Sequence, residues 1–437
     1  MAVTKYPLII FTIAYLTRTA FTFPSSLQED PAVTKLRTYL RFRSAHPDPD
    51  SGYEQAIPWL EQYAEELGLE FNFLDLDEPN RFAVWMTWRG SDPSLKSVLL
   101  NSHMDVVAAE PDKWEYHPFE AYKDAEGNIF GRGASDMKSA TIAELEAIRK
   151  LKTSGFQPLR TIHLTVMPDE ELGGVRGMIP FVKTDEFKNL NVGINIDEGF
   201  PIDSENMVHI TYAEKSIWQF NITARGAAGH ASTLPEYTAG QRLQVVIDKL
   251  LAYRESELQK LQNPDVTVDQ LTSLNLVRLG GGIGDNTIPN EVWASFDMRI
   301  WLLPNWNFTD VENMILNITE EARLGSTPNE VTLNFILKSM EAGRTTPDDS
   351  NVWWTVVQDS CREMNITCPP NVLSAATDGR YVRSMDIPVF GICPFPNTPN
   401  TAHQDNEFIN EANFLKGIER YATLIQKLAV LPGNLYP

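Results

Sequence analysis

Apolar strand-like runs alternate with amphipathic helical stretches along most of this chain, and that alternation constrains its fold more than any other feature. The apolar runs cover residues 97–100, 161–167, 192–196 and 388–393, and the helical stretches cover 32–43, 53–67, 140–153 and 351–364. Alternation of this kind is typical of a sheet that is covered by helices on both faces. The sequence therefore predicts a doubly wound α/β layer with a mixed sheet.

The rhythm changes between about residues 208 and 324. A strand is predicted at 217–224, a helix at 239–262, two strands at 273–280 and 291–300, and a helix at 309–323. This βαββα order is typical of a separate small α+β domain. Because the α/β rhythm returns afterwards, we expect a large domain at 23–210 and 327–437, with the small domain, 211–326, inserted into it.

Composition disfavours several other classes of protein. The 437 residues suffice for two or three domains at roughly 100 to 200 residues each. A net charge of −21 disfavours a nucleic-acid partner, because phosphate backbones are repelled. The three cysteines, Cys361, Cys368 and Cys393, lack the spacing of a thiolate zinc site, so any metal must be held by histidine and carboxylate groups. Cys361 and Cys368 lie close enough to form a disulfide in an oxidising compartment, and three buried thiols are the alternative.

The N-terminal segment, 1–22, is interpreted as a signal peptide. An apolar run at 7–16 follows a basic start, and Ala20 and Thr22 place small residues before a cut at Phe23. The run has about ten residues and a spanning helix needs about 20, so an uncleaved anchor is the less favoured alternative. We therefore expect a secreted protein without stable membrane association. Four sequons agree with a glycoprotein on the secretory route: Asn221, Asn307, Asn317 and Asn365.

The first candidate site residues lie at 99–105, where the chain reads LLNSHMD. Residues i and i+2 of an extended chain lie on the same face, so His103 and Asp105 can contact each other. A metal-binding imidazole usually donates its second N–H to a carboxylate. His103 is therefore a candidate metal ligand with Asp105 as its partner. A surface histidine beside a solvated aspartate is the alternative.

The second candidate lies in GRGASDMK at 131–138. Its two glycines indicate a backbone that bends or approaches another group closely, and Asp136 stands just before a helical stretch. A carboxylate in this position can bridge two cations. The alternative is an aspartate that caps the helix N-terminus.

The third candidate is a run of acids that follows the strand-like run at 161–167. After Pro168 come Asp169, Glu170 and Glu171, and two glycines close the segment. Like charges this close together are costly unless a cation lies among them. Adjacent Glu170 and Glu171 point in different directions, so one can bind a metal while the other acts as a general base. A solvated acidic loop is the alternative.

Two further candidates complete the set. The run at 192–196 ends in Asp197 and Glu198, and open α/β sheets place their sites at the carboxyl ends of strands. His403 stands in TAHQDNE near the C-terminus. The candidate ligands of a two-metal site are thus His103, Asp136, Glu171, Glu198 and His403. The remaining histidines outside the small domain, His46, His117, His163 and His209, show no comparable context and are interpreted as structural or surface residues.

Taken in order, SHMDVV, GRGASDMK, PDEELGG, IDEG, GHAS and the late His403 resemble the motifs of the co-catalytic zinc family of aminoacylases and carboxypeptidase G-type peptidases. The ordered set is most similar to aminoacylases that hydrolyse N-acyl-L-amino acids. Glu198 agrees with this, because peptidase relatives more often have an aspartate there. The similarity extends from about residue 30 to about residue 430.

The resemblance implies a role for each candidate. Asp136 would bridge two zinc ions, with His103 and Glu198 completing one coordination shell and Glu171 and His403 the other. Glu170 would be the general base, Asp105 would orient His103, and the Asp136–Met137 peptide would be cis. The activity implied is zinc-dependent hydrolysis of an N-acyl-L-amino acid to a carboxylate and a free amino acid.

The small domain resembles a dimerisation or lid domain. His230 in GHAS resembles an imidazole that reaches into the partner's active site in a homodimer and stabilises the oxyanion. Asn286 in GDNTIP and Arg299 in FDMRI resemble substrate-binding residues, and Arg380 in ATDGRY could assist them. An arginine fork suits a free α-carboxylate, while an ion pair on the strand surface is the alternative for Arg299.

Two other functions stay open on the sequence alone. A dipeptidase or carboxypeptidase could use the same scaffold. A non-catalytic relative is disfavoured, because neither a ligand nor the base is missing. The chain also departs from its relatives in two ways: the segment around His403 has a single histidine, and well-known aminoacylases of this type are cytosolic.

Overall fold

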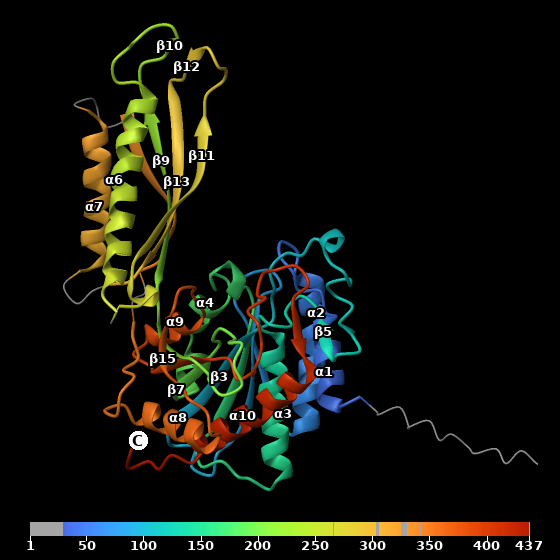
Figure 1. The fold of residues 1–437 in the computed structure, drawn as a ribbon. Coiled ribbons are helices and arrows are strands. Elements are labelled where there is room, and N and C mark those ends of the chain that lie inside the picture. The colour runs from blue at the N-terminus through green and yellow to red at the C-terminus, as the bar shows by residue number, and fades with distance from the viewer. Residues whose placement is uncertain (1–28, 265, 303–305, 325–329, 341–342, 437) are drawn as a thin grey trace, which may run out of the picture.

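The chain forms two bodies (Figure 1). The computed structural model describes residues 29–264, 266–302, 306–324, 330–340 and 343–436. The larger body contains an eight-stranded mixed sheet and the smaller one, at the upper left, a four-stranded antiparallel sheet. The predicted signal peptide lies outside the described residues. Within the described ranges, no helix is both long enough and apolar enough to cross a bilayer.

The large sheet has the strand order β1-β2-β6-β3-β7-β16-β8-β15. The bounds are β1 Glu70–Asp75, β2 Phe82–Trp88, β3 Ser97–His103, β6 Ile162–Met167, β7 Val192–Asp197, β8 Ile210–Glu214, β15 Pro370–Leu373 and β16 Val389–Ile392. Four neighbouring strands, β6, β3, β7 and β16, run parallel to one another. Their carboxyl ends therefore meet at one edge of the sheet.

Helices cover both faces of this sheet. Their bounds are α1 Pro31–Leu40, α2 Asp50–Leu67, α3 Lys138–Thr153, α4 Met178–Phe181, α5 Asp185–Asn189, α8 Val352–Glu363, α9 Gly379–Arg383 and α10 Glu411–Ala429. On β3, Val98 and Leu100 belong to the core beneath α1, α2, α3, α8 and α10, whereas Leu99 belongs to the core beneath α4, α5 and α9. A strand that is apolar on both faces must lie between two helical layers. The predicted doubly wound α/β layer is confirmed.

The smaller body is the expected α+β unit with one additional strand. It consists of β9 Ser216–Arg225, α6 Ala239–Gln259, β11 Ser273–Gly281, β13 Glu291–Ile300, α7 Phe308–Ala322 and β14 Val331–Lys338. Both helices lie on one face of the sheet (Figure 1), where they pack on alternate β9 residues, Trp218, Phe220 and Ile222. Because β14 pairs with β9, the small sheet continues past residue 326, where we expected the inserted domain to end. We expected the inserted domain to begin at residue 211, but β8, which ends at Glu214, belongs to the large sheet.

Three short pieces complete the architecture. At the far tip of the smaller body, β10 (Gly229–His230) pairs with β12 (Thr287–Ile288). Beside the large sheet, β4 (Tyr122–Lys123), β5 (Asn128–Phe130) and β17 (Phe408–Asn410) form a three-stranded sheet. The 3-10 turns are η1 Pro111–Lys113, η2 Glu170–Leu172, η3 Lys260–Gln262 and η4 Val268–Gln270.

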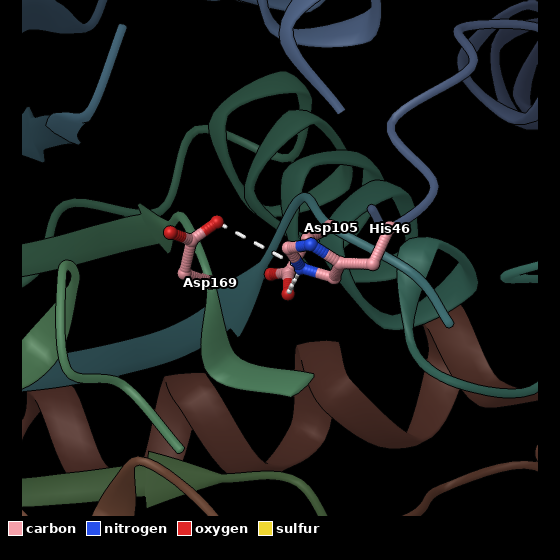
Figure 2. Close-up of side chains that lie close together, drawn as sticks. All are labelled: His46, Asp105 and Asp169. Carbon is pink, nitrogen blue, oxygen red and sulfur yellow. Dashed lines mark hydrogen bonds and ion pairs between the residues drawn. The ribbon is translucent and has the colours of Figure 1, made fainter. Parts of the chain in front are cut away.

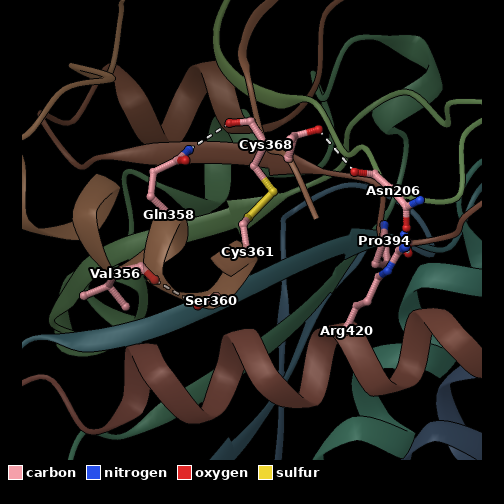
Figure 3. Close-up of a disulfide and its surroundings, with 9 residues drawn as sticks. Asn206, Val356, Gln358, Ser360, Cys361, Cys368, Pro394 and Arg420 are labelled. Atoms are coloured by element: carbon pink, nitrogen blue, oxygen red, sulfur yellow. Dashed lines mark hydrogen bonds between the residues drawn. A yellow bond between two sulfur atoms is a disulfide. The ribbon is translucent and has the colours of Figure 1, made fainter. Parts of the chain in front are cut away.

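Cys361 and Cys368 are joined in a disulfide (Figure 3), which was one of the two alternatives left open by the sequence. The bond ties the end of α8 to the segment that leads into β15. The side chain of Gln358 reinforces this link by donating a hydrogen bond to the carbonyl of Cys368 at 2.8 Å. Cys393 has a free thiol.

Candidate metal centre and active site

The candidate ligands converge at the edge of the large sheet where the parallel strands end. His103 is the last residue of β3, Glu198 directly follows β7, and η2 lies just beyond β6. Because these strands are parallel neighbours, the three segments lie beside one another. Asp136 reaches the same place from the loop before α3, and its peptide bond to Met137 is cis, as the resemblance implies.

The loop that carries Asp136 is held by a buried carboxylate from the C-terminal segment. Glu407 accepts hydrogen bonds from the backbone N–H groups of Ser135 and Asp136 at 2.6 and 3.0 Å. Its other oxygen accepts the N–H of Gly133 at 3.1 Å and pairs with the Arg132 guanidinium at 2.6 Å. Sequence reasoning gave Glu407 no role, because nothing in a single acidic residue before a short strand identifies its distant partners.

The five predicted ligands form two groups of three that share Asp136. In one group, His103 Nε2 lies 3.1 Å from Asp136 Oδ1 and 3.8 Å from Glu198 Oε1. In the other, His403 Nε2 lies 3.3 Å from Asp136 Oδ2 and 3.0 Å from Glu171 Oε2. Each oxygen of one carboxylate therefore faces a different group.

The charges at this edge favour a bound cation. Hydrogen bonds to Asp136 and Glu171 raise the pKa of His403 to about 10. Burial raises the pKa of Glu198 well above its usual range, and the neighbouring Asp136 charge raises it further. Ionised carboxylates this close together repel one another, and this repulsion helps to raise the pKa of Glu198, whereas their attraction for a proton on the imidazole raises the pKa of His403. An added positive charge would stabilise the ionised carboxylates. Two sets of one imidazole and two carboxylates fit zinc, whose catalytic sites have three protein ligands of these types and one open position.

Glu170 is next to these groups but belongs to neither of them. Together with Asp136, Glu171, Glu198 and His403, it lines a cavity of about 290 Å³. Burial raises the pKa of Glu170 well above its usual range, and the neighbouring charges of Asp378 and Glu171 raise it further. The apolar side chains of the wall are Phe200, Leu373, Ala375, Ala376 and Ala402.

Arg299 is the predicted substrate-binding residue that reaches this cavity. It lies near the end of β13, opposite Ile217 at the start of β9, where the smaller body joins the larger one. Its guanidinium also forms a fork with Asp297 on the same strand, at 2.7 and 3.1 Å. Arg299 therefore forms the strand ion pair that the sequence left open as the alternative. It also lies on the cavity wall.

The other predicted substrate and oxyanion residues lie apart from the cavity. His230 and Asn286 meet at the tip of the smaller body, where the backbone N–H of Ala231 donates to the carbonyl of Asn286 at 2.9 Å. Both side chains are exposed. Arg380, at the start of α9, does not line the cavity, although its positive charge acts on Glu170.

Asp105 orients His103 mainly through its backbone rather than through its carboxylate. The His103 Nδ1 atom lies 2.9 Å from the Asp105 carbonyl and 3.5 Å from the carboxylate. The carboxylate instead accepts hydrogen bonds from the backbone N–H groups of Glu170 and Glu171 at 3.1 and 3.0 Å. It also contacts His46 at 3.0 Å, a histidine that we interpreted from the sequence as structural or surface (Figure 2).

Comparison with known proteins shows the family. The profile of peptidase family M20/M25/M40 matches residues 99–427. The chain belongs to this family. It is 41% identical to aminoacylase-1A of Rattus norvegicus over 93% of this chain and 97% of the relative. It is also 37% identical to aminoacylase-1 of Dictyostelium discoideum over 92% of this chain and 99% of the relative.

Solved structures with low sequence identity share the fold. An M20 family metallo-carboxypeptidase from Sulfolobus solfataricus matches with a TM-score of 0.71 at 19% identity, covering 92% of this chain and 100% of that one. A dipeptidase from Saccharomyces cerevisiae matches with a TM-score of 0.69 at 17% identity, covering 92% of this chain and 96% of that one.

The comparisons confirm the expected class of enzyme and correct the expected location. The chain is an M20 hydrolase that acts on amide bonds, and its activity is the hydrolysis of N-acyl-amino acids. Its described residues include groups that could hold a metal ion. The prediction of a secreted protein is wrong, because the aminoacylase-1 relatives that align over nearly their whole length are cytosolic enzymes.

Proposed function

We propose that this chain binds two zinc ions and uses them to hydrolyse N-acyl-L-amino acids. One ion would be held by His103, Asp136 and Glu198, and the other by Asp136, Glu171 and His403. The observation that carries the proposal is the shared carboxylate, since each Asp136 oxygen faces its own histidine. Bound zinc polarises the acyl carbonyl and lowers the pKa of a water molecule towards neutrality.

Glu170 is proposed to move the protons. Its carboxylate takes a proton from the attacking water, and the protonated carboxyl then donates that proton to the leaving amino group. Its position on the cavity wall, outside both ligand groups, supports this role. The raised pKa of Glu170 supports it as well, because the protonated form is then accessible in the second step.

Arg299 is proposed to bind the free α-carboxylate of the substrate. Asp297 occupies the Nε and one Nη2 donor of the guanidinium, so the substrate carboxylate would accept from Nη1 and the second Nη2 N–H, at the cavity wall that Arg299 lines. The apolar wall suits an aliphatic or aromatic group rather than a charged one. Arg380 would act on Glu170 through its positive charge and not by contact with the substrate.

A homodimer is proposed to complete the site. The larger body would carry the zinc ligands, and the smaller body would form the dimer and present His230 and Asn286 to the partner. Strands rise about 3.3 Å per residue, so β9 from Ile217 to Arg225 spans roughly 26 Å. This length between Arg299 and the tip supports a role for the tip in another subunit.

Metal analysis and a three-substrate assay test the proposed function. We expect two zinc ions per chain in dialysed active protein, and we expect chelator to abolish turnover that added zinc restores. The substrates are N-acetyl-methionine, a long-chain N-acyl-glutamine and a dipeptide. Turnover of either acyl substrate above the dipeptide supports the proposal. One zinc ion or none, or preference for the dipeptide, would contradict it.

A further inference from the structure

A third cluster of ligand-type side chains consists of His46, Asp105 and Asp169 (Figure 2). His46 Nε2 is 3.0 Å from Asp105 Oδ2 and 3.7 Å from Asp169 Oδ1. The backbone brings the imidazole there: the His46 N–H donates to the Val106 carbonyl at 3.0 Å, and the Val106 N–H donates to the Ser44 carbonyl at 3.0 Å. The segment after α1 is therefore fixed alongside the residues that follow β3.

This cluster is not suited to a cation. Asp169 already pairs with two guanidinium groups, Arg81 at 2.6 Å and Arg176 at 2.7 Å. Its other oxygen accepts a hydrogen bond from the Tyr53 hydroxyl at 3.0 Å. A metal ion would have to displace these partners and would be repelled by both arginines. The imidazole therefore serves the carboxylates rather than a metal.

Asp105 connects His46 to the catalytic residues. Its completely buried carboxylate receives the backbone N–H groups of Glu170 and Glu171, which fix the orientation of η2. Those two residues are the proposed base and a proposed zinc ligand. A rotation of the Asp105 carboxylate would release both N–H groups together, and His46 contacts the same oxygen, Oδ2, that accepts the N–H of Glu171.

The burial of His46 is poorly explained by stability alone. Its side chain is 9% exposed, yet Nδ1 has no hydrogen-bond partner among the described residues. A buried polar atom without a partner lowers the stability of the folded state. The interaction that the buried ring does make is the contact between Nε2 and the Asp105 carboxylate.

We propose that His46 is a positioning residue for the active site. By donating from Nε2 to Asp105, it holds the carboxylate in the orientation that fixes the backbone of Glu170 and Glu171. His46 does not line the cavity, so it acts on turnover and on zinc affinity without touching the substrate. The inference rests on the proposed roles of Glu170 and Glu171.

Two amide variants separate positioning from packing. In His46→Gln the amide nitrogen can occupy the place of Nε2, whereas the shorter side chain of His46→Asn does not reach Asp105. We expect His46→Asn to lower kcat about 10-fold or more with KM unchanged, and to weaken zinc binding by a similar factor, which is the range for lost outer-shell partners. His46→Gln is expected to stay within about threefold of wild type in both. Zinc affinity is measured by chelator competition on the purified protein, independently of activity.

His163 provides the matched control. It is also buried, and its imidazole contacts Thr87 at 2.9 Å, but it lies near the start of β6, at the opposite end from η2. His163→Asn and His163→Gln should lower the melting temperature and leave kcat and zinc affinity unchanged. Wild-type kcat and zinc affinity in His46→Asn, or equal losses in His46→Gln and His46→Asn, would overturn the inference. Failure of the proposed function would appear separately, as wild-type protein that lacks zinc-dependent turnover.

Discussion

At the scale of single residues, two adjacent glutamates have different surroundings and therefore different expected roles. Glu171 contacts His403 and belongs to a ligand group, while Glu170 does not. Glu170→Gln should keep both zinc ions and lower kcat by roughly 10²- to 10⁴-fold, because a positioned base typically contributes that factor. Glu171→Gln should instead lower zinc affinity. Metal content and turnover of both variants check this, and full turnover with full metal in both would show that the roles are wrong.

Arg299 gives a second prediction at this scale. Arg299→Lys keeps the charge but loses the paired donors, so KM should rise roughly 10- to 100-fold, the equivalent of one charged hydrogen bond. Arg225, at the other end of β9, is exposed and pairs with Glu291, so Arg225→Lys is the control. The measurement is kcat and KM on an N-acyl-amino acid and on the N-acyl-amino-acid amide, in which a carboxamide replaces the free α-carboxylate. An equal loss of kcat/KM on both substrates would contradict carboxylate binding.

At the scale of elements, the sequence predicted several of the main strands and helices because their patterns are strong, but it did not predict β1, β2, β8, β15 or α10. The strands β3, β6 and β7 are buried along their whole length, and a polar candidate residue stands at or just after the end of each. By contrast, β14 was missed although residues 331–335 alternate between apolar and polar, because exposed Ile336 and Leu337 break the alternation where the register with β9 shifts. His46 and Glu407 were missed for another reason, since their roles depend on partners that only the folded chain brings near.

Glu407 holds the loop that carries Asp136 through its contacts with Arg132, Gly133, Ser135 and Asp136, which we call the loop clamp. Removing one partner of a buried ion pair typically costs about 3–5 kcal/mol, so Glu407→Gln should lower the free energy of unfolding by that order. Zinc affinity should fall with it, because the backbone N–H groups of Ser135 and Asp136 lose a charged acceptor. Denaturant unfolding and chelator competition measure the two effects.

The matched variant for Glu407 is Glu411→Gln. Glu411 forms a partly exposed ion pair with Lys123 near the same short sheet, and such pairs contribute little to stability. We expect unchanged zinc affinity and a change in unfolding free energy of about 1 kcal/mol or less. Similar zinc losses in both variants would indicate a general weakening of the segment rather than a specific clamp on Asp136.

At the scale of the whole molecule, the cavity and the tip of the smaller body are separated by the length of β9. Four of the proposed zinc ligands, the proposed base and Arg299 line the cavity at one end, and β10 and β12, which carry or adjoin His230 and Asn286, lie at the other (Figure 1). Exposed Leu234 and Ile283 accompany His230 and Asn286 at that tip. Apolar side chains exposed beside polar candidates are typical of a surface that contacts another molecule. The geometry thus supports a site assembled from two subunits.

Subunit mixing tests this assembly directly. If the imidazole of His230 stabilises the oxyanion in the partner's cavity, His230→Ala and Glu170→Gln should each be nearly inactive as homodimers. In a mixed dimer, one of the two composite sites combines an intact Glu170 from one chain with an intact His230 from the other. A statistical mixture of exchanged subunits contains about half mixed dimers, and each has one intact site of two, so activity should return to roughly a quarter of the wild-type value.

Mixing Glu170→Gln with Glu171→Gln is the control and should restore nothing, because both changes affect the same cavity and each composite site then lacks either the base or a zinc ligand. Exchange is verified with two distinguishable tags. Exchanged but inactive mixtures of the first pair would mean that His230 serves its own chain or only packs.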